Sequence, residues 1–326
     1  MIEALAEVLG RATGVPVTVT AVTALSGGAS SETFAVDATR GGAPWQLIFQ
    51  RSAGATAAGQ PTKATQAALQ QIAARHGLPV AAVVAVTTPG DTLGDGFVMA
   101  RVDGEALASR WLKAECYAAA RAALPRQCAE ALAKLHAVPL PEVAHLGLQQ
   151  DSTRAQCERY AALYRGFGIP VPAFDLAFGW LAERVPATTP TALLHGDFRS
   201  GNLLVDTQGL AAVLDWELAH LGDPAEDLAW LCVNAWRFGH WQRPVGGFGE
   251  RAELYDAYAA AGGGVIDRAT AHVFEVYGTL RWGVMCLQLA HDHLTGRVRS
   301  VERAAIGRRV TEVEADLLHL LKYGDI

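Results

Sequence analysis

The fold of this chain is decided by the stretch His195-Gly196-Asp197-Phe198-Arg199-Ser200-Gly201-Asn202, which is followed by Asp215-Trp216-Glu217. Between the two stretches lie two short apolar runs, 203–205 and 211–214, separated by Thr207-Gln208-Gly209. Apolar runs flanking a short polar stretch with Gly are typical of a β-hairpin. If the chain turns at residues 208 and 209, Asn202 lies directly opposite Asp215.

This hairpin predicts a site for a divalent cation. Cross-strand partners have Cβ atoms about 4.5–5.5 Å apart, which lets an amide oxygen of Asn202 and a carboxylate oxygen of Asp215 bind one Mg²⁺ at about 2.1 Å. Asp197 lies in the glycine-containing loop before the hairpin and is free to approach the same point. We therefore expect two metal ligands and one further carboxylate around a single centre.

The distribution of charge supports the same region. The chain has 27 Lys and Arg residues and 33 Asp and Glu residues, a net charge of −6. Residues 195–232 alone hold seven acids and one base, so they carry the whole excess. Buried carboxylates need compensation, and a divalent metal is the simplest source. A solvated helix face accounts for Glu226, but not for Asp197 or Asp215, which lie beside apolar runs.

Composition excludes several classes of function. A net negative chain has no basic footprint for nucleic acid, and the longest purely apolar stretch, 80–86, is too short to span a membrane. Glu3 and Glu7 stand where a signal peptide carries Lys or Arg, so we expect a cytoplasmic protein. A nucleophile-elbow hydrolase needs GxSxG, which is missing. The stretch Gly247-Phe248-Gly249 follows no buried strand, unlike a dinucleotide-binding loop.

Two domains are expected, because 326 residues exceed one ordinary core of 100 to 200 residues. Residues 1–101 predict an opening helix at 2–11, a helix at 61–76 and a small antiparallel sheet. The strands of this sheet are expected in 17–22, 33–36, 45–51, 80–86 and 97–102. Residues 102–326 predict a mainly helical domain, with helices at 106–124, 126–136, 153–165, 174–184 and from 227 onward.

The stretches 195–202 and 215–217 resemble the catalytic loop and the metal-binding segment of the aminoglycoside phosphotransferase family. Residues 25–36 resemble its nucleotide loop, residues 97–104 its interlobe hinge, and residues 222–229 the helix start after the metal aspartate. The subgroup related to acyl-CoA-dehydrogenase-associated phosphotransferases is similar at 279–282 and 308–321. The resemblance covers nearly the whole chain and implies an α+β, bilobal, protein-kinase-like fold, with an N-lobe at 1–101 and a C-lobe at 102–326.

The resemblance implies an enzyme that moves the γ-phosphate of ATP to a hydroxyl of a small molecule with the help of Mg²⁺, GTP being the open alternative. Asp197 would accept or orient the hydroxyl proton, Arg199 would bind the γ-phosphate, and Asn202 and Asp215 would hold the metal. His195 would brace the loop. The residues implied for nucleotide binding are Ser26, Gly27, Gly28, Ala29, Ser30, Gln50, Arg51, Met99, Ala100 and Val102.

One feature departs from the family pattern. Family members carry Lys or Arg in the third strand, paired with Glu from the next helix, whereas this strand offers Gln50 or Arg51 and residues 54–90 contain no acid. The rival function is therefore a catalytically inactive kinase-like module that binds a nucleotide or a partner. The joint presence of Asp197, Asn202 and Asp215 favours the enzyme, because a binding module needs no base.

The acceptor is expected to be a hydroxyacyl-CoA-like molecule, an amino alcohol or a sugar. Residues 233–326 hold 11 bases and 11 acids, which gives no acidic surplus for a polycationic aminoglycoside. Aromatic residues in the same region indicate a partly apolar wall of the acceptor cleft. These residues are Trp230, Trp236, Trp241, Trp282, Phe238, Phe248 and Tyr277.

Overall fold

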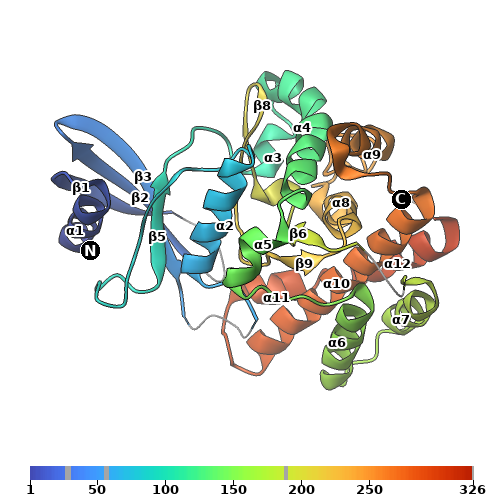
Figure 1. Cartoon of the computed structure of the whole chain (residues 1–326). Coiled ribbons are helices and arrows are strands. Elements are labelled where there is room, and N and C mark those ends of the chain that lie inside the picture. The colour runs from blue at the N-terminus through green and yellow to red at the C-terminus, as the bar shows by residue number, and fades with distance from the viewer. Residues whose placement is uncertain (26–30, 55–58, 187–189, 325–326) are drawn as a thin grey trace.

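A five-stranded antiparallel sheet dominates the first hundred residues. In spatial order its strands are β1 (Val17–Leu25), β2 (Ser31–Arg40), β3 (Ala43–Ser52), β5 (Gly96–Ala100) and β4 (Val83–Val86). Alternating side chains of β1 and β3 are buried on one face, against α1 (Ile2–Thr13). The second helix, α2 (Lys63–Arg75), lies between the sheet and the rest of the molecule (Figure 1). The computed structural model describes residues 1–25, 31–54, 59–186 and 190–324.

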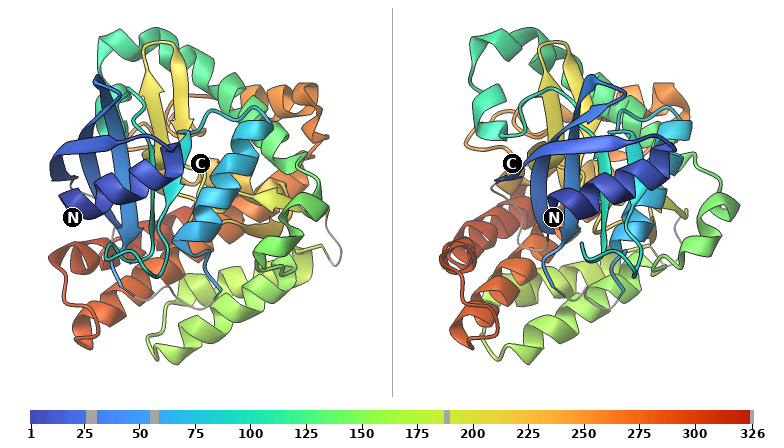
Figure 2. Two further views of the ribbon diagram at one scale, coloured as in Figure 1. Left: turned by 60° about the vertical axis from the view of Figure 1, so that its left-hand side comes forward. Right: turned by 90° about the vertical axis from the view of Figure 1, so that its left-hand side faces the viewer.

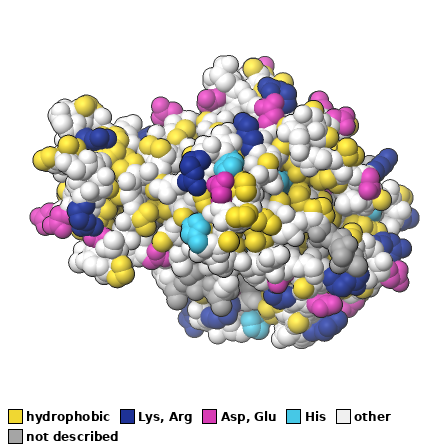
Figure 3. Space-filling view, in the orientation of Figure 1, with side chains coloured by type: hydrophobic (Ala, Val, Ile, Leu, Met, Phe, Trp, Pro, Cys, Tyr) yellow, Lys and Arg dark blue, Asp and Glu magenta, His cyan; other side chains and the backbone are white. Residues whose placement is uncertain are grey.

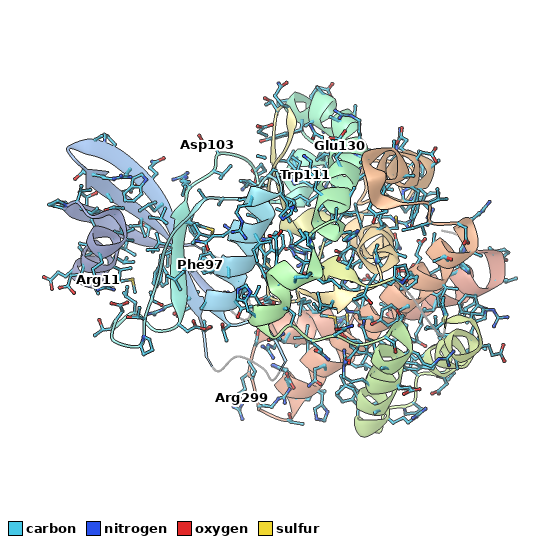
Figure 4. All side chains as sticks on the ribbon, in the orientation of Figure 1. Arg11, Phe97, Asp103, Trp111, Glu130 and Arg299 are labelled. Carbon is cyan, nitrogen blue, oxygen red and sulfur yellow. The ribbon has the colours of Figure 1, made fainter. Side chains whose placement is uncertain are left out.

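One extended segment connects the sheet lobe to the helical lobe. It begins after Ala100 at the end of β5, carries Asp103 (Figure 4), and ends at α3 (Ala108–Trp111). Glu105 on this segment forms a β-bridge with Val205 in the helical lobe. The predicted boundary between residues 101 and 102 lies in this segment.

The second lobe is mainly helical and contains two small two-stranded sheets, β6–β9 and β7–β8. Both views of Figure 2 place the last helices beneath the sheet lobe. The helices after α3 are α4 (Ala118–His136), α5 (Leu140–Val143), α6 (Thr153–Gly166), α7 (Pro172–Arg184), α8 (Ala225–Cys232), α9 (Arg251–Tyr258), α10 (Arg268–Leu294), α11 (Val301–Gly307) and α12 (Val310–Tyr323). The strands are β6 (Ala192–Leu194), β7 (Leu203–Asp206), β8 (Gly209–Val213) and β9 (His220–Gly222).

These two lobes confirm the predicted α+β, protein-kinase-like architecture. No helix in the described part of the chain has the length and apolarity needed to cross a bilayer. On the face shown in Figure 3, basic and acidic side chains are mixed rather than gathered by sign.

Helix α4 differs from the prediction, which placed a break between residues 124 and 126. The helix runs through Pro125 without interruption. A proline inside a helix removes one backbone hydrogen bond, but this ring is buried, and Gly249 lies so close that a Cβ there would collide with it. The helix therefore continues through Pro125, and the proline ring packs against Gly249.

The predicted hairpin is confirmed as β7–β8, but its predicted register is wrong. Leu203 pairs with Val213, and the N–H of Leu214 donates to the carbonyl of Asn202 at 2.9 Å. Asn202 therefore faces Leu214, and Asp215 lies one residue beyond it.

The turn explains this shift. The carboxylate of Asp206 accepts the N–H groups of Gln208 and Gly209 at 2.7 and 2.9 Å, which closes the chain one residue earlier than predicted. This earlier turn alone would place Val213 opposite Asn202, and a bulge between Leu204 and Val205 moves the register back by one residue, so that Leu214 faces Asn202. Bulges of this kind cannot be read from an apolar pattern, because they change pairing without changing polarity.

Candidate active site

Asp197 is held by three side-chain donors. Its Oδ1 accepts Nε1 of Trp230 at 2.8 Å and Nε of Arg199 at 3.0 Å, while its Oδ2 accepts Nδ2 of Asn202 at 2.6 Å. The residue is 7% exposed. Both carboxylate oxygens are thus held in one orientation. A group that must approach a substrate at a fixed angle requires such an orientation.

The loop that carries Asp197 is anchored by Asp227 at the start of α8. The two oxygens of Asp227 accept the consecutive N–H groups of His195 and Gly196, each at 2.8 Å. Nε2 of His136 in α4 lies 3.2 Å from the same carboxylate. Burial opposes ionisation of Asp227, but His136 and His195, through their hydrogen bonds and charge, together outweigh it and lower the pKa of Asp227. These contacts give Asp227 a structural role.

His195 braces the loop rather than acting on a substrate. Burial lowers its pKa, so the ring is neutral. Its Nε2 donates to the carbonyl of Leu214 at 3.0 Å, and its Nδ1 accepts the N–H of Asp197 at 3.2 Å. With both ring nitrogens engaged, His195 has no free basic atom for proton transfer.

A second buried network lies behind the loop. Arg281 of α10 donates to the carbonyl of Gly196 at 3.0 Å and to Oε1 of Glu226 at 2.9 Å. His220 Nε2 lies 3.2 Å from the same Oε1. Glu226 is 2% exposed, so the prediction that it belongs to a solvated helix face is wrong. Its charge is compensated by His220 of β9, six residues before it, and by Arg281 of α10, which is remote in sequence.

This network predicts a pH-dependent stability. Burial acts to lower the pKa of His220, but Glu226 outweighs it and raises that pKa above the ordinary value. A raised histidine pKa stabilises the fold below the unfolded value of about 6.5, and this contribution disappears as pH rises through the folded pKa. We expect the Tm of the wild-type protein to fall as pH increases above about 6.5. In His220→Gln the part of the Tm decline that comes from His220 is lost. Identical profiles of Tm against pH for the wild type and the variant would contradict the role given to His220.

Asp215 is the one carboxylate of the motif that keeps an unsatisfied buried oxygen in the described part of the chain. Its Oδ1 has no hydrogen-bond partner there, and its backbone has φ 66°, a strained value for a residue with a side chain. Burial, then Glu217 and Asp197, raise the pKa of Asp215 to about 7. A buried, unpartnered carboxylate oxygen is what a hard cation requires.

The residues present therefore fit a magnesium ion that is bound partly by the protein and partly by the oxygens of a ligand. Nδ2 of Asn202 donates to Asp197, which leaves its amide oxygen for another partner. Within the described ranges, no group of three or more His, Cys, Asp or Glu side chains is arranged to enclose a metal. Asn202 and Asp215 alone are two ligands, so oxygens of a phosphate would have to complete the shell, as Mg²⁺ usually requires.

A cleft of about 1560 Å³ joins this motif to both lobes. This volume exceeds the range of about 300–1,000 Å³ typical of one small ligand, so it can hold a nucleotide and an acceptor together. Residues of the sheet lobe on its wall include Ser31, Ser52 and Lys63. The catalytic motif contributes Asp197, Arg199, Asp215 and Glu217.

The far wall of the cleft is aromatic, as predicted, but with fewer members. Phe248 and Tyr277 are buried in the two cores of the helical lobe. The other five predicted residues line the cleft: Trp230, Trp236, Phe238, Trp241 and Trp282.

Three of these indole rings already carry an arginine. Arg281 lies 4.6 Å from the centroid of Trp230, Arg199 lies 4.7 Å from Trp236, and Arg309 lies 5.8 Å from Trp282. Cation–π contacts of this kind use the electron-rich ring face. The faces that would attract a quaternary ammonium are thus partly occupied.

The residues predicted for nucleotide binding are placed unevenly. Ser26, Gly27, Gly28, Ala29 and Ser30 lie outside the described residues. Met99 and Ala100 form the end of β5, and Val102 follows in the connecting segment. The N–H of Ala100 donates to Ala82 at 2.8 Å, whereas the N–H of Val102 has no acceptor in the described part of the chain.

The third strand separates the two residues that were expected to provide a phosphate contact. Gln50 pairs with Thr33, on the face that also presents Ser52 to the cleft. Arg51 lies on the opposite face, where its Nε is 2.6 Å from Glu32. Arg51 therefore has a carboxylate partner, contrary to the expectation that it lacks one.

Three residues at the site were not predicted for these roles: Lys63, Trp230 as a donor to Asp197, and Arg281. Trp230 was assigned only to the acceptor wall, and Arg281 appeared only as part of the similar stretch 279–282. Lys63 carried one visible signal, because it is the only charged side chain in 54–74. All three contacts join segments far apart in sequence, which local pattern does not reveal.

The contact between Trp230 and Asp197 predicts a specific catalytic defect. Trp230→Phe keeps an aromatic ring but removes the donor to Oδ1, so Asp197 loses one of its restraints. We expect kcat to fall about 10- to 100-fold, as for small misplacements of reacting groups, with little change in the KM for the nucleotide.

Trp111→Phe is the matched control, because Trp111 is also fully buried and lies in the helical lobe (Figure 4). Its Nε1 has no partner in the described part of the chain. Equal kcat in the two variants would show that Trp230 acts through packing alone.

Comparison with known proteins agrees with this geometry. The model of the phosphotransferase enzyme family (APH) matches residues 21–269. Mouse acyl-CoA dehydrogenase family member 10 is 35% identical over 109 residues, which is 32% of this chain and 10% of that protein. Mouse acyl-CoA dehydrogenase family member 11 is 30% identical over 179 residues, 52% of this chain and 22% of that protein. The chain thus matches a minor part of these relatives.

Solved structures share the fold over almost the whole chain. A protein from Ralstonia eutropha, solved as a candidate aminoglycoside phosphotransferase, superposes with a TM-score of 0.74 at 20% identity, covering 96% of this chain and 95% of that one. A spectinomycin phosphotransferase in complex with ADP and spectinomycin gives a TM-score of 0.66 at 13% identity, covering 98% and 99%. At these identities the likeness shows the fold.

Proposed function

The chain belongs to the phosphotransferase enzyme family, and from this premise we propose that it transfers the γ-phosphoryl group of ATP to the hydroxyl of a small molecule. One observation carries the proposal. A positioned carboxylate, Asp197, an amide, Asn202, and an unpartnered buried carboxylate, Asp215, belong to one short segment beside a cleft large enough for two ligands. A module that only binds a nucleotide has no use for the first of these.

In this proposal Asp197 accepts the proton of the acceptor hydroxyl. The hydroxyl oxygen attacks the γ-phosphorus, and the bond between that phosphorus and ADP breaks. Arg199 contacts Asp197 through Nε alone, at 3.0 and 3.1 Å to the two oxygens. Its terminal nitrogens are therefore available for the γ-phosphate, for which the planar guanidinium is well suited. Trp236 beneath the guanidinium keeps it extended along the cleft.

Asn202 and Asp215 would hold Mg²⁺. When bound, the ion neutralises phosphate charge that would otherwise meet the carboxylates of the site. Asp215 fits this role because its charge has no other direct partner among the described residues.

The purine would lie at the end of β5, against Met99. The carbonyl of Ala100 and the N–H of Val102 are the backbone groups proposed to read its edge, because the N–H of Ala100 is already bonded to Ala82. The loop Ser26–Ser30 is proposed to cover the phosphates through its N–H groups. ATP is the proposed donor, with GTP as the alternative that a direct comparison of the two nucleotides would decide.

The proposed acceptor is a hydroxyacyl thioester. Four acids line the outer cleft, and two of them, Asp292 and Glu312, are paired with Arg303 and Arg309. That leaves little free negative charge for a polycation. The arginines stacked on the indole rings likewise disfavour a quaternary amino alcohol. The names of the curated relatives, acyl-CoA dehydrogenase family members, favour an acyl-CoA-like acceptor over a sugar.

Release of ADP tests the proposed reaction. The purified protein is incubated with Mg²⁺ and ATP and a panel containing hydroxyacyl-CoA, an amino alcohol, a sugar and an aminoglycoside. We expect release only with a hydroxyl-bearing acceptor, fastest with hydroxyacyl-CoA. Asp197→Asn is expected to bind ATP normally and to lose at least about 100-fold in kcat.

Glu130→Gln on α4 removes a carboxylate that lies off the cleft (Figure 4) and is expected to leave turnover unchanged. Nucleotide binding without turnover on any acceptor would favour the catalytically inactive module instead.

The variant Asp215→Asn separates the effect of this charge on turnover from its effect on folding. The buried carboxylate of Asp215 has a raised pKa, so its ionised form opposes folding at pH 8. We expect the amide variant to lose turnover but to have a Tm at pH 8, without ligands, at least as high as that of the wild type. Addition of Mg²⁺ with ATP should raise the Tm of the wild type more than that of the variant. A lower Tm for the unliganded variant would contradict the unsatisfied state of Asp215.

A further inference from the structure

Lys63 is a buried cation on the wall of the cleft. It is the first residue of α2, it is 3% exposed, and its backbone N–H donates to Asp95 at 3.1 Å. Its Nζ donates to Oγ of Ser31 at 2.7 Å and to Oε1 of Gln66 at 2.9 Å. Two neutral oxygens thus fix the ammonium group in place beside the catalytic motif.

No carboxylate in the described part of the chain forms an ion pair with Lys63. A buried ammonium without a counter-ion is costly, and a cation in the first turn of a helix also opposes the helix dipole. Burial accordingly lowers the pKa of Lys63, while Asp215 and Glu217 act in the opposite sense from a greater distance. A position that is unfavourable on these two counts is explained when an anion completes it.

The third strand offers no alternative cation to the cleft. Arg51 lies on the face that carries Phe34, with its guanidinium 5.4 Å from that ring and bonded to Glu32. Gln50, on the same face as Ser52, is uncharged. Lys63 and Arg199 are therefore the two cations at the catalytic end of the cleft, within the residues that the structure describes.

We propose that Lys63 of α2, held by Ser31 and Gln66, is the cation that binds the phosphates of the nucleotide, in place of a basic residue on the third strand. The inference rests on the proposed nucleotide-dependent function. Gln66 takes the position of an acceptor to the ammonium group but carries no charge, so the full positive charge of Lys63 remains for the phosphate oxygens. The ligand class is a nucleoside di- or triphosphate.

Calorimetric titration with ADP and with a non-hydrolysable ATP analogue, both with Mg²⁺, tests this role without relying on turnover. Lys63→Met removes the ammonium group and keeps a flexible chain of similar length. We expect its Kd for both nucleotides to rise about 10- to 100-fold, the range for a lost charge-assisted hydrogen bond. Arg51→Met and Lys113→Met remove a positive charge elsewhere, and their Kd values are expected to stay within about twofold of the wild type.

A double variant gives the sharpest result. Gln50→Lys combined with Lys63→Met returns the cation to the cleft face of the third strand, and we expect it to recover at least about half of the lost binding free energy. Rescue of this kind would not occur if Lys63 acted only by packing. Tm is measured for every variant; Lys63→Gln serves as the second substitution, and loss of folding in both would overturn the proposal in favour of a structural role.

The remaining outcomes separate this inference from the proposed function. If the wild type binds nucleotide and Lys63→Met binds it equally well, the inference is overturned and the kinase function stands. If Arg51→Met weakens nucleotide binding and Lys63→Met does not, the cation that binds the phosphates lies on β3 and the inference is overturned. If the wild type binds neither nucleotide, both proposals fail together.

Discussion

The proposed catalytic centre depends on one buried carboxylate, Asp227. It receives two consecutive N–H groups of the loop, those of His195 and Gly196, so it sets the direction of the chain immediately before Asp197. His136 of α4 reaches the same carboxylate, and Arg281 of α10 holds the loop from the carbonyl of Gly196. Three helices thus position one short loop, and on this fixed backbone Trp230, Arg199 and Asn202 orient the carboxylate of Asp197.

The acidic excess of residues 195–232 is resolved mostly by protein groups. A charge count along the sequence indicated a metal, because one arginine cannot balance seven acids. The structure supplies histidine and arginine partners from α4, β9 and α10 for Asp227 and Glu226. What remains is a single buried oxygen of Asp215 without a partner in the described part of the chain. A cation is therefore indicated by this one oxygen atom and its surroundings rather than by the net charge of the region.

The sequence was sufficient where structure follows local pattern. The hairpin around residues 207–209, the sheet lobe and the helical lobe all follow from the alternation of apolar and polar residues and from turn residues. It was insufficient where one residue of register or one choice of face decides the outcome. The earlier turn and the bulge after Leu204 together shift the partner of Asn202 from Asp215 to Leu214, and the pleat of β3 turns Arg51 away from the cleft. Lys63 meets Ser31, and Trp230 meets Asp197, across more than 30 residues of sequence, which no periodicity encodes.

The placement of a lysine and its amide acceptor on the same helix has a mechanical consequence. In an arrangement with the cation on a strand and its acceptor on a helix, the two elements must come into alignment before the phosphate contact exists. Lys63 and Gln66 are three residues apart, so both members of this pair belong to the one helix α2. Under the proposal, a shift of α2 would move Lys63 and Gln66 together relative to the phosphates, and it would act on the sheet at the same time, because Lys63 also bonds to Ser31 of β2.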